Sequence, residues 1–69
     1  MSDFISRLYD EKQQLEERYT KLKDFIFTDA FTQLDGVQQA LLEIQVSAMQ
    51  TYLKVLIERI IRLEPQSNA

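Results

Sequence analysis

Apolar residues recur every three or four positions from Phe4 to Phe27, which is the spacing of one face of a helix. Leu8, Leu15 and Leu22 share one heptad position, and charged or amide residues fill most positions between them. The pattern predicts an amphipathic helix over residues 3–27. Its apolar face consists of Ile5, Leu8, Leu15, Tyr19, Leu22 and Ile26.

Residues 28–35 interrupt this pattern. The segment TDAFTQLD is rich in threonine and aspartate, which form turns and helix caps. Asp35, followed three residues later by Gln38, resembles a capping box that opens a second helix. We expect Phe31 and Leu34 to fold back and fill the closed end of a hairpin, because aromatic side chains mostly serve packing. The alternative is an exposed aromatic docking knob.

The second predicted helix, residues 36–63, is apolar on two faces. The Val37 stripe consists of Val37, Leu41, Ile44, Ala48, Tyr52 and Val55. The Leu42 stripe consists of Leu42, Val46, Met49, Leu53, Leu56, Ile60 and Leu63. One partner helix covers a single stripe about 100° wide, and soluble monomers rarely expose a large apolar patch. We therefore assign the Leu42 stripe to an interface between copies of the chain.

The composition indicates an all-α fold. With 45% hydrophobic residues, one Gly and one Pro, the chain has much to bury and few places to turn. A core of 69 residues is marginal, and no cysteine is present to add a disulfide. We predict a two-helix antiparallel hairpin over residues 1–64 that assembles into a helical-bundle homo-oligomer. A disordered polar tail is expected over residues 65–69, beginning at Pro65.

Charge and hydropathy exclude several partners. The net charge of −3 arises from eight Lys or Arg and eleven Asp or Glu residues without a basic block, which disfavours binding to duplex nucleic acid. No uncharged apolar run reaches the ~18 residues of a membrane span, and the N-terminus does not resemble a signal peptide. We expect a cytoplasmic protein, located in the host cell if a phage encodes it.

The residue types offer little for catalysis. The chain has no His and no Cys, so the usual general base and the commonest transition-metal ligands are missing. The scattered carboxylates form no constellation of nucleophile, base and orienting group. The sequence therefore predicts a protein that is not an enzyme, with no catalytic residue, metal site or cofactor.

Residues 17–23, ERYTKLK, place Arg18, Lys21 and Lys23 around Tyr19 within two helical turns. Arginine and lysine pair with phosphate, and tyrosine can stack on a base, so the segment suits an anion with a flat ring. The alternative is structural. Tyr19 then belongs to the core seam, and the cations extend over apolar surface.

ERYTKLK resembles the E-R-Y-x-x-I-R segment in the first helix of the phage anti-CBASS and anti-Thoeris cyclic-nucleotide sponges. The second helix is similar to theirs at Met49, Tyr52 (tryptophan in that family), Ile57 and Arg59. The chain is also similar to small phage and prophage helical-hairpin proteins. That pattern comprises Phe25, Ile26, Phe31, Leu34, Gln38, Leu41, Leu42, Gln45, Met49, Tyr52, Leu56 and Arg59.

The first resemblance implies a symmetric oligomer that sequesters cyclic oligonucleotide immune signals at a subunit interface. By position, Arg18 and Lys23 match the family's basic residues and Tyr19 its aromatic residue, so these three are the predicted ligand contacts. The family's Cys-Pro-type turn is replaced here by residues 27–36, so no contact from that turn is carried over.

Two other hypotheses remain. One is a coiled-coil interaction module or inhibitor that docks a host or phage protein through the Leu42 stripe. The other is a purely structural coiled coil.

Overall fold

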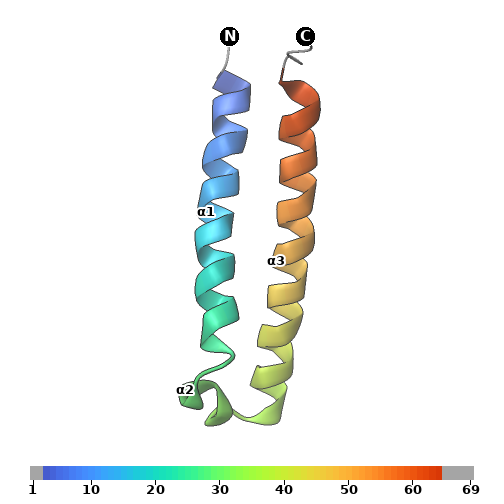
Figure 1. Cartoon of the computed structure of the whole chain (residues 1–69). Coiled ribbons are helices and arrows are strands. Elements are labelled where there is room, and N and C mark those ends of the chain that lie inside the picture. Colours follow the sequence, from blue (N-terminus) through green and yellow to red (C-terminus); the bar gives the residue numbers. More distant parts are fainter. Residues whose placement is uncertain (1–2, 65–69) are drawn as a thin grey trace.

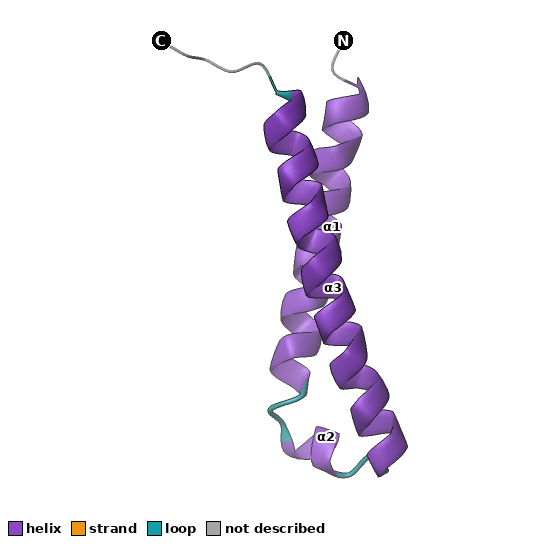
Figure 2. Ribbon diagram, turned by 90° about the vertical axis from the view of Figure 1, so that its right-hand side faces the viewer, coloured by secondary structure: helices purple, strands orange, loops and turns teal. Residues whose placement is uncertain are grey.

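A computed structural model describes residues 3–64, which form two long antiparallel helices joined by a short one (Figure 1). The first residues of α1 and the last of α3 lie at one end of the hairpin, and α2 lies at the other (Figure 1). Seen after a quarter turn, the two long helices cross each other at a shallow angle (Figure 2). The helices are α1 (Asp3–Phe25), α2 (Asp29–Thr32) and α3 (Gly36–Leu63). The all-α hairpin is confirmed for the described residues, and the predicted tail over 65–69 lies outside them.

The hairpin is elongated. Its Cα radius of gyration is 15.9 Å and its principal extents are 52 × 18 × 16 Å, whereas a compact domain of this length has a radius of gyration of about 11 Å. Two helices side by side enclose no interior. Each of them therefore buries only the strip of its surface that faces the other.

The core lies along the contact between α1 and α3. Leu8 and Leu15 from α1 form one cluster with Leu56 and Ile60 from α3, and the Leu56 side chain is completely buried. Met49 and Leu53 are partly buried against this cluster. The predicted apolar face of the first helix is thus the face that contacts α3.

Within the chain, α1 covers the Leu42 stripe of α3 and leaves the Val37 stripe exposed. The Leu42 stripe, assigned above to contacts between copies, packs against α1 within the chain. Leu63 at its end is exposed. The Val37 stripe faces solvent, with Val37 and Ile44 exposed by 69% and 64%.

The length of the two stripes explains why α1 packs against the Leu42 stripe rather than the Val37 stripe. The Leu42 stripe consists of large side chains and continues to Ile60. Because α1 runs antiparallel to α3, Leu8 near the start of α1 packs in the same cluster as Ile60. The Val37 stripe ends at Val55 and contains the small Ala48. The longer and bulkier stripe buries more apolar surface against α1, and apolar burial is the dominant favourable term in folding.

Thr28 ends the first helix and begins the second. Its hydroxyl donates to the carbonyl oxygen of Phe25 at 2.6 Å and accepts from the backbone N–H of Phe31 at 3.3 Å. The backbone N–H groups of Phe27 and Thr28 donate to carbonyl groups three rather than four residues back, and Thr28 itself is extended, with φ −99° and ψ 162°. For this reason α1 stops at Phe25 rather than at the predicted residue 27. A short helix therefore occupies part of the predicted turn.

Asp35 opens α3 as its N-cap. Its Oδ1 accepts a hydrogen bond of 2.8 Å from the backbone N–H of Gln38, which satisfies one of the free donors at a helix start. The side chain of Gln39 adds a bond of 2.8 Å from Nε2 to the carbonyl oxygen of Leu34. The cap predicted from the sequence at Asp35 is confirmed.

Phe31 closes the turn end of the hairpin. Its side chain is only 6% exposed, and its ring meets that of Phe25 edge to face with 6.1 Å between centroids. Leu34 is half-buried nearby in the chain, whereas Phe27 is 82% exposed. The packing role predicted for Phe31 is confirmed, and the exposed ring of this segment is Phe27.

A side-chain hydrogen bond joins the two helices at the open end. The Tyr9 hydroxyl, on α1, donates to Oε2 of Glu64, the residue that follows α3. This hydrogen bond raises the pKa of Tyr9 above its ordinary value, because it favours the protonated phenol, and the negative charge of Glu64 adds to the effect. The residues are 55 positions apart, so the contact depends on the hairpin.

Phe31→Ala should destabilise the hairpin by about 3–5 kcal/mol, since it removes a buried ring and leaves a cavity. The measurement is the midpoint of urea unfolding followed by circular dichroism. Phe27→Ala is the matched control, because its ring is exposed, and it should change the midpoint little. Equal midpoints for both variants would contradict a packing role for Phe31.

Glu64→Gln should lower the pKa of Tyr9 toward the ordinary value, about 10. Because the pKa is raised by folding, the stabilising contribution is complete below the pKa of unfolded tyrosine and is lost as the pH rises through the folded pKa. The measurement is a titration of the Tyr9 ring signals by NMR. Glu43→Gln, at an exposed position on α3, should leave the Tyr9 titration unchanged.

Candidate functional site

The structure separates the three predicted ligand residues into two groups. Neighbouring residues on a helix point about 100° apart, and the line of Leu8, Leu15 and Leu22 that faces α3 runs between Arg18 and Tyr19. Arg18 therefore lies on one flank of the α1–α3 contact and Tyr19 on the other. One chain brings Tyr19 and Lys23 together but keeps Arg18 apart from them.

Tyr19 and Lys23 form a cation–π pair one turn apart on α1. The Lys23 ammonium lies 5.4 Å from the centroid of the Tyr19 ring, which is half-buried. Such a pair contributes about 0.5–1 kcal/mol at exposed sites. Lys23 also lies in the last turn of α1, where a cation is favoured by the helix dipole. These two residues thus have a structural role beside the one predicted.

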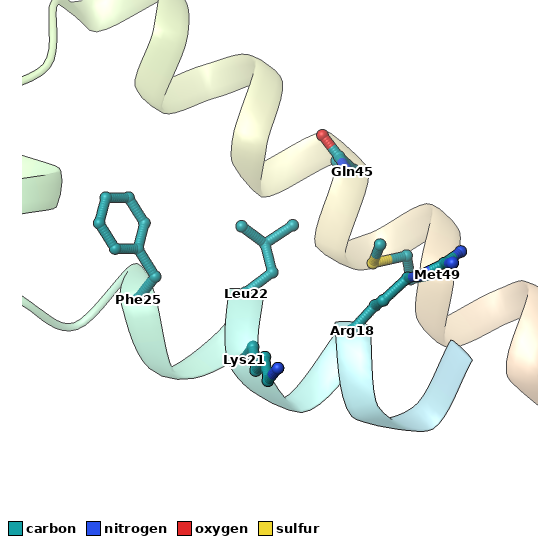
Figure 3. A pocket seen from close by; sticks show the side chains of 6 residues that line it. All are labelled: Arg18, Lys21, Leu22, Phe25, Gln45 and Met49. Carbon is teal, nitrogen blue, oxygen red and sulfur yellow. The ribbon is translucent and has the colours of Figure 1, made fainter. Parts of the chain in front are cut away.

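Arg18 lies at a groove between the two long helices. Figure 3 shows its side chain extending from α1 toward Met49 on α3. The groove has a volume of about 390 Å³ and is open to solvent. Its lining residues are Arg18, Lys21, Leu22, Phe25, Gln45 and Met49.

The groove has an apolar floor and a polar rim. Leu22, Phe25 and Met49 supply the floor, whereas Arg18, Lys21 and Gln45 supply a guanidinium, an ammonium and an amide. No carboxylate is among the lining residues, although the whole chain carries a net charge of −3. The groove is therefore a locally positive site suited to an anion with an apolar or flat part.

Lys21 and Gln45 were not among the predicted ligand residues. The sequence could have placed Lys21 beside Arg18, because Arg18, Lys21 and Phe25 are spaced three and four residues apart and share one face of α1. Gln45 gave no such signal. Its position opposite them depends on the register between α1 and α3.

A second depression lies on the outer surface of α1 alone. It is lined by Gln13, Glu16, Glu17, Thr20 and Lys21. Two of these residues are carboxylates, and Glu16 forms an ion pair of 3.5 Å with Lys12. An anion is disfavoured there, so the groove between the helices is the better candidate site.

The groove borders the exposed Val37 stripe. Gln45 lies one helical turn after Leu41 of that stripe, and residues four apart are neighbours on a helix surface. At the far end of the same face, the Arg59 guanidinium lies 5.9 Å from the centroid of the Phe4 ring. A partner that covered the Val37 stripe would lie directly beside the groove.

Among residues 3–64, no group of three or more His, Cys, Asp or Glu side chains could hold a metal ion. No helix in the same range is long and apolar enough to cross a membrane.

The family model of Sequestin matches residues 2–62. No curated protein and no solved structure matches the chain. The matched range contains the ERYTKLK segment, the whole turn and nearly all of both long helices. Since that match covers most of the chain, this protein belongs to the sequestin family, the phage cyclic-nucleotide sponges that ERYTKLK resembles, and its role is to sequester a small signal.

Proposed function

We propose that the protein binds a cyclic oligonucleotide between copies of the chain and thereby removes an immune signal from the host cytoplasm. The observation that carries this proposal is the Sequestin match over residues 2–62, which includes ERYTKLK. Sequestering requires affinity and many binding sites but no turnover. A small chain with cations, tyrosines and an amide has the groups for this task.

The proposed ligand contacts are Arg18, Tyr19 and Lys23. Arg18 lies on one flank of the hairpin and Tyr19 with Lys23 on the other, so the three do not line one groove within a single chain. A copy packed against the Tyr19 flank could present its own Arg18 flank to the same ligand, through a contact separate from the one that uses the Val37 stripe. This separation supports binding at an interface between subunits rather than within a hairpin.

Self-association is proposed to use the Val37 stripe, not the Leu42 stripe. Its residues recur every three or four positions, and Leu41 and Val55 are about half exposed. So long an apolar row is unusual on a soluble monomer. The Val37 stripe of a second copy can cover this row, because apolar residues at this spacing pack against each other in helical bundles.

An antiparallel arrangement of two α3 helices suits the Val37 stripe. It places the positive N-terminal end of one helix dipole beside the negative C-terminal end of the other. Ala48, near the middle of the stripe, allows two helices to approach closely. Parallel copies would instead place like ends of the two helix dipoles together.

The alternative function is docking of a host or phage protein. The sequence analysis placed this docking on the Leu42 stripe. In the structure the Val37 stripe is the exposed one, and its exposure is the observation that favours docking of another protein. The oligomeric state separates the two functions. A folded monomer with an open Val37 stripe would favour docking of another protein.

Leu41→Glu combined with Val55→Glu should convert the oligomer into a folded monomer. Both side chains are exposed in a single hairpin, so the fold is retained, but desolvating unpaired carboxylates at an interface costs several kcal/mol. Sedimentation equilibrium at micromolar concentration measures the mass. Ser47→Glu with Gln50→Glu adds the same charge to the polar face of α3 and should keep the wild-type mass. A wild-type monomer would contradict self-association.

Isothermal titration calorimetry with cyclic dinucleotides and trinucleotides should detect binding that weakens as salt rises, because phosphate contacts are screened. Arg18→Ala should lower affinity about tenfold or more, since a hydrogen bond to a charged group is worth about 1.5–3 kcal/mol. Arg62→Ala is the control, because Arg62 is exposed and pairs with Glu58. No heat with any cyclic nucleotide would contradict the proposed function.

A further inference from the structure

We propose that the groove between α1 and α3 is a binding site for one phosphate-bearing nucleotide unit, with Lys21 and Gln45 as binding residues beside Arg18. This inference rests on the proposed function and deepens it. It names a site that combines both helices, whereas the contacts predicted from the sequence all lie on α1.

The shape of the groove suits part of a nucleotide. Ligand pockets commonly measure about 300–1,000 Å³, and the groove, at about 390 Å³, is near the lower limit. That volume accommodates a base with its sugar or phosphate, and the rest of a cyclic oligonucleotide would extend beyond the open side of the groove. Each groove therefore takes one unit of the ring, and further units reach another copy of the chain.

The chemistry of the lining divides between the parts of such a unit. Arg18 and Lys21, three residues apart on α1, supply two cations to a phosphate. Phe25 and Met49 supply an aromatic ring and a polarizable thioether, both of which contact a flat base favourably. The Gln45 amide both donates and accepts hydrogen bonds, so it can read a base edge.

The groove is incomplete in one hairpin. It is open to solvent and borders the Val37 stripe, so a second copy on that stripe adds a further wall. A ligand held by two copies binds the assembled state more tightly than the free chain. Ligand binding should therefore strengthen self-association, as any ligand stabilises the state that it prefers.

Met49 provides a direct probe of the groove. The chain has two methionines, Met1 and Met49, so the Met49 methyl signal is easily resolved when both methyl groups carry ¹³C. We would titrate the full chain with cyclic di-AMP, cyclic tri-AMP and AMP while following both signals. The Met49 methyl should shift saturably, while Met1 serves as the internal reference.

Substitutions test the two new residues. Lys21→Ala and Gln45→Ala should each weaken binding of cyclic di-AMP or cyclic tri-AMP roughly tenfold by calorimetry, the effect of losing one hydrogen bond to a charged or well-placed group. Lys54→Ala and Gln50→Ala are matched controls on the exposed side of α3 and should bind like the wild type. Circular dichroism checks that all four variants stay helical.

The outcomes distinguish this site from the function on which it rests. Calorimetric binding without a Met49 shift, and with wild-type affinity for the Lys21 and Gln45 variants, overturns the groove but leaves the sponge function. A saturable Met49 shift with AMP alone supports the groove and overturns cyclic-nucleotide sequestration. The absence of both heat and shift overturns both proposals.

Discussion

The main constraint on this structure is that α3 has two apolar faces and only one helix, α1, to pack against them. The α3 helix has apolar residues on two faces, but a hairpin offers one neighbouring helix, and α1 covers the Leu42 stripe alone. Only five hydrophobic side chains are buried among the described residues: Leu8, Leu15, Phe31, Leu56 and Ile60. So small a core is marginal for independent stability. The exposed Val37 stripe is apolar surface that a single hairpin leaves uncovered.

The pairing of α1 with α3 also determines where the charged residues lie. Once Leu8 and Leu15 face α3, the rotation of α1 is set, and Arg18 must lie on one flank and Tyr19 on the other. The Arg18 flank meets Gln45 across the groove and continues into the Val37 stripe. The groove with its cations and the exposed Val37 stripe therefore lie on the same side of the hairpin.

This arrangement suits a protein that holds a ligand rather than converts it. An acidic chain has little general attraction for nucleic acid, yet a groove lined by two cations and no carboxylate is positive locally. Long polyanions are thus disfavoured, whereas the charge of the groove suits a small anion. Membership of the sequestin family agrees with such a role, and the repeated sites of an oligomer would increase the number of signals removed.

The sequence by itself determined the two long helices and the start of α3, but not the short helix α2 or the end of α1 at Phe25. Helical periodicity located both long helices, Asp35 marked the start of α3, and the aromatic Phe31 between them was recognisable as packing. These features are local, because each depends on residues within a few turns. The family likeness in ERYTKLK was readable for the same reason.

Only the tertiary structure decided which stripe of α3 meets α1 and which residues share the groove with Arg18. Periodicity reports where a residue lies around its own helix axis, whereas stripe choice depends on the surface that two helices bury together. Gln45 joins Arg18 and Lys21 only through that shared register, which no single segment encodes.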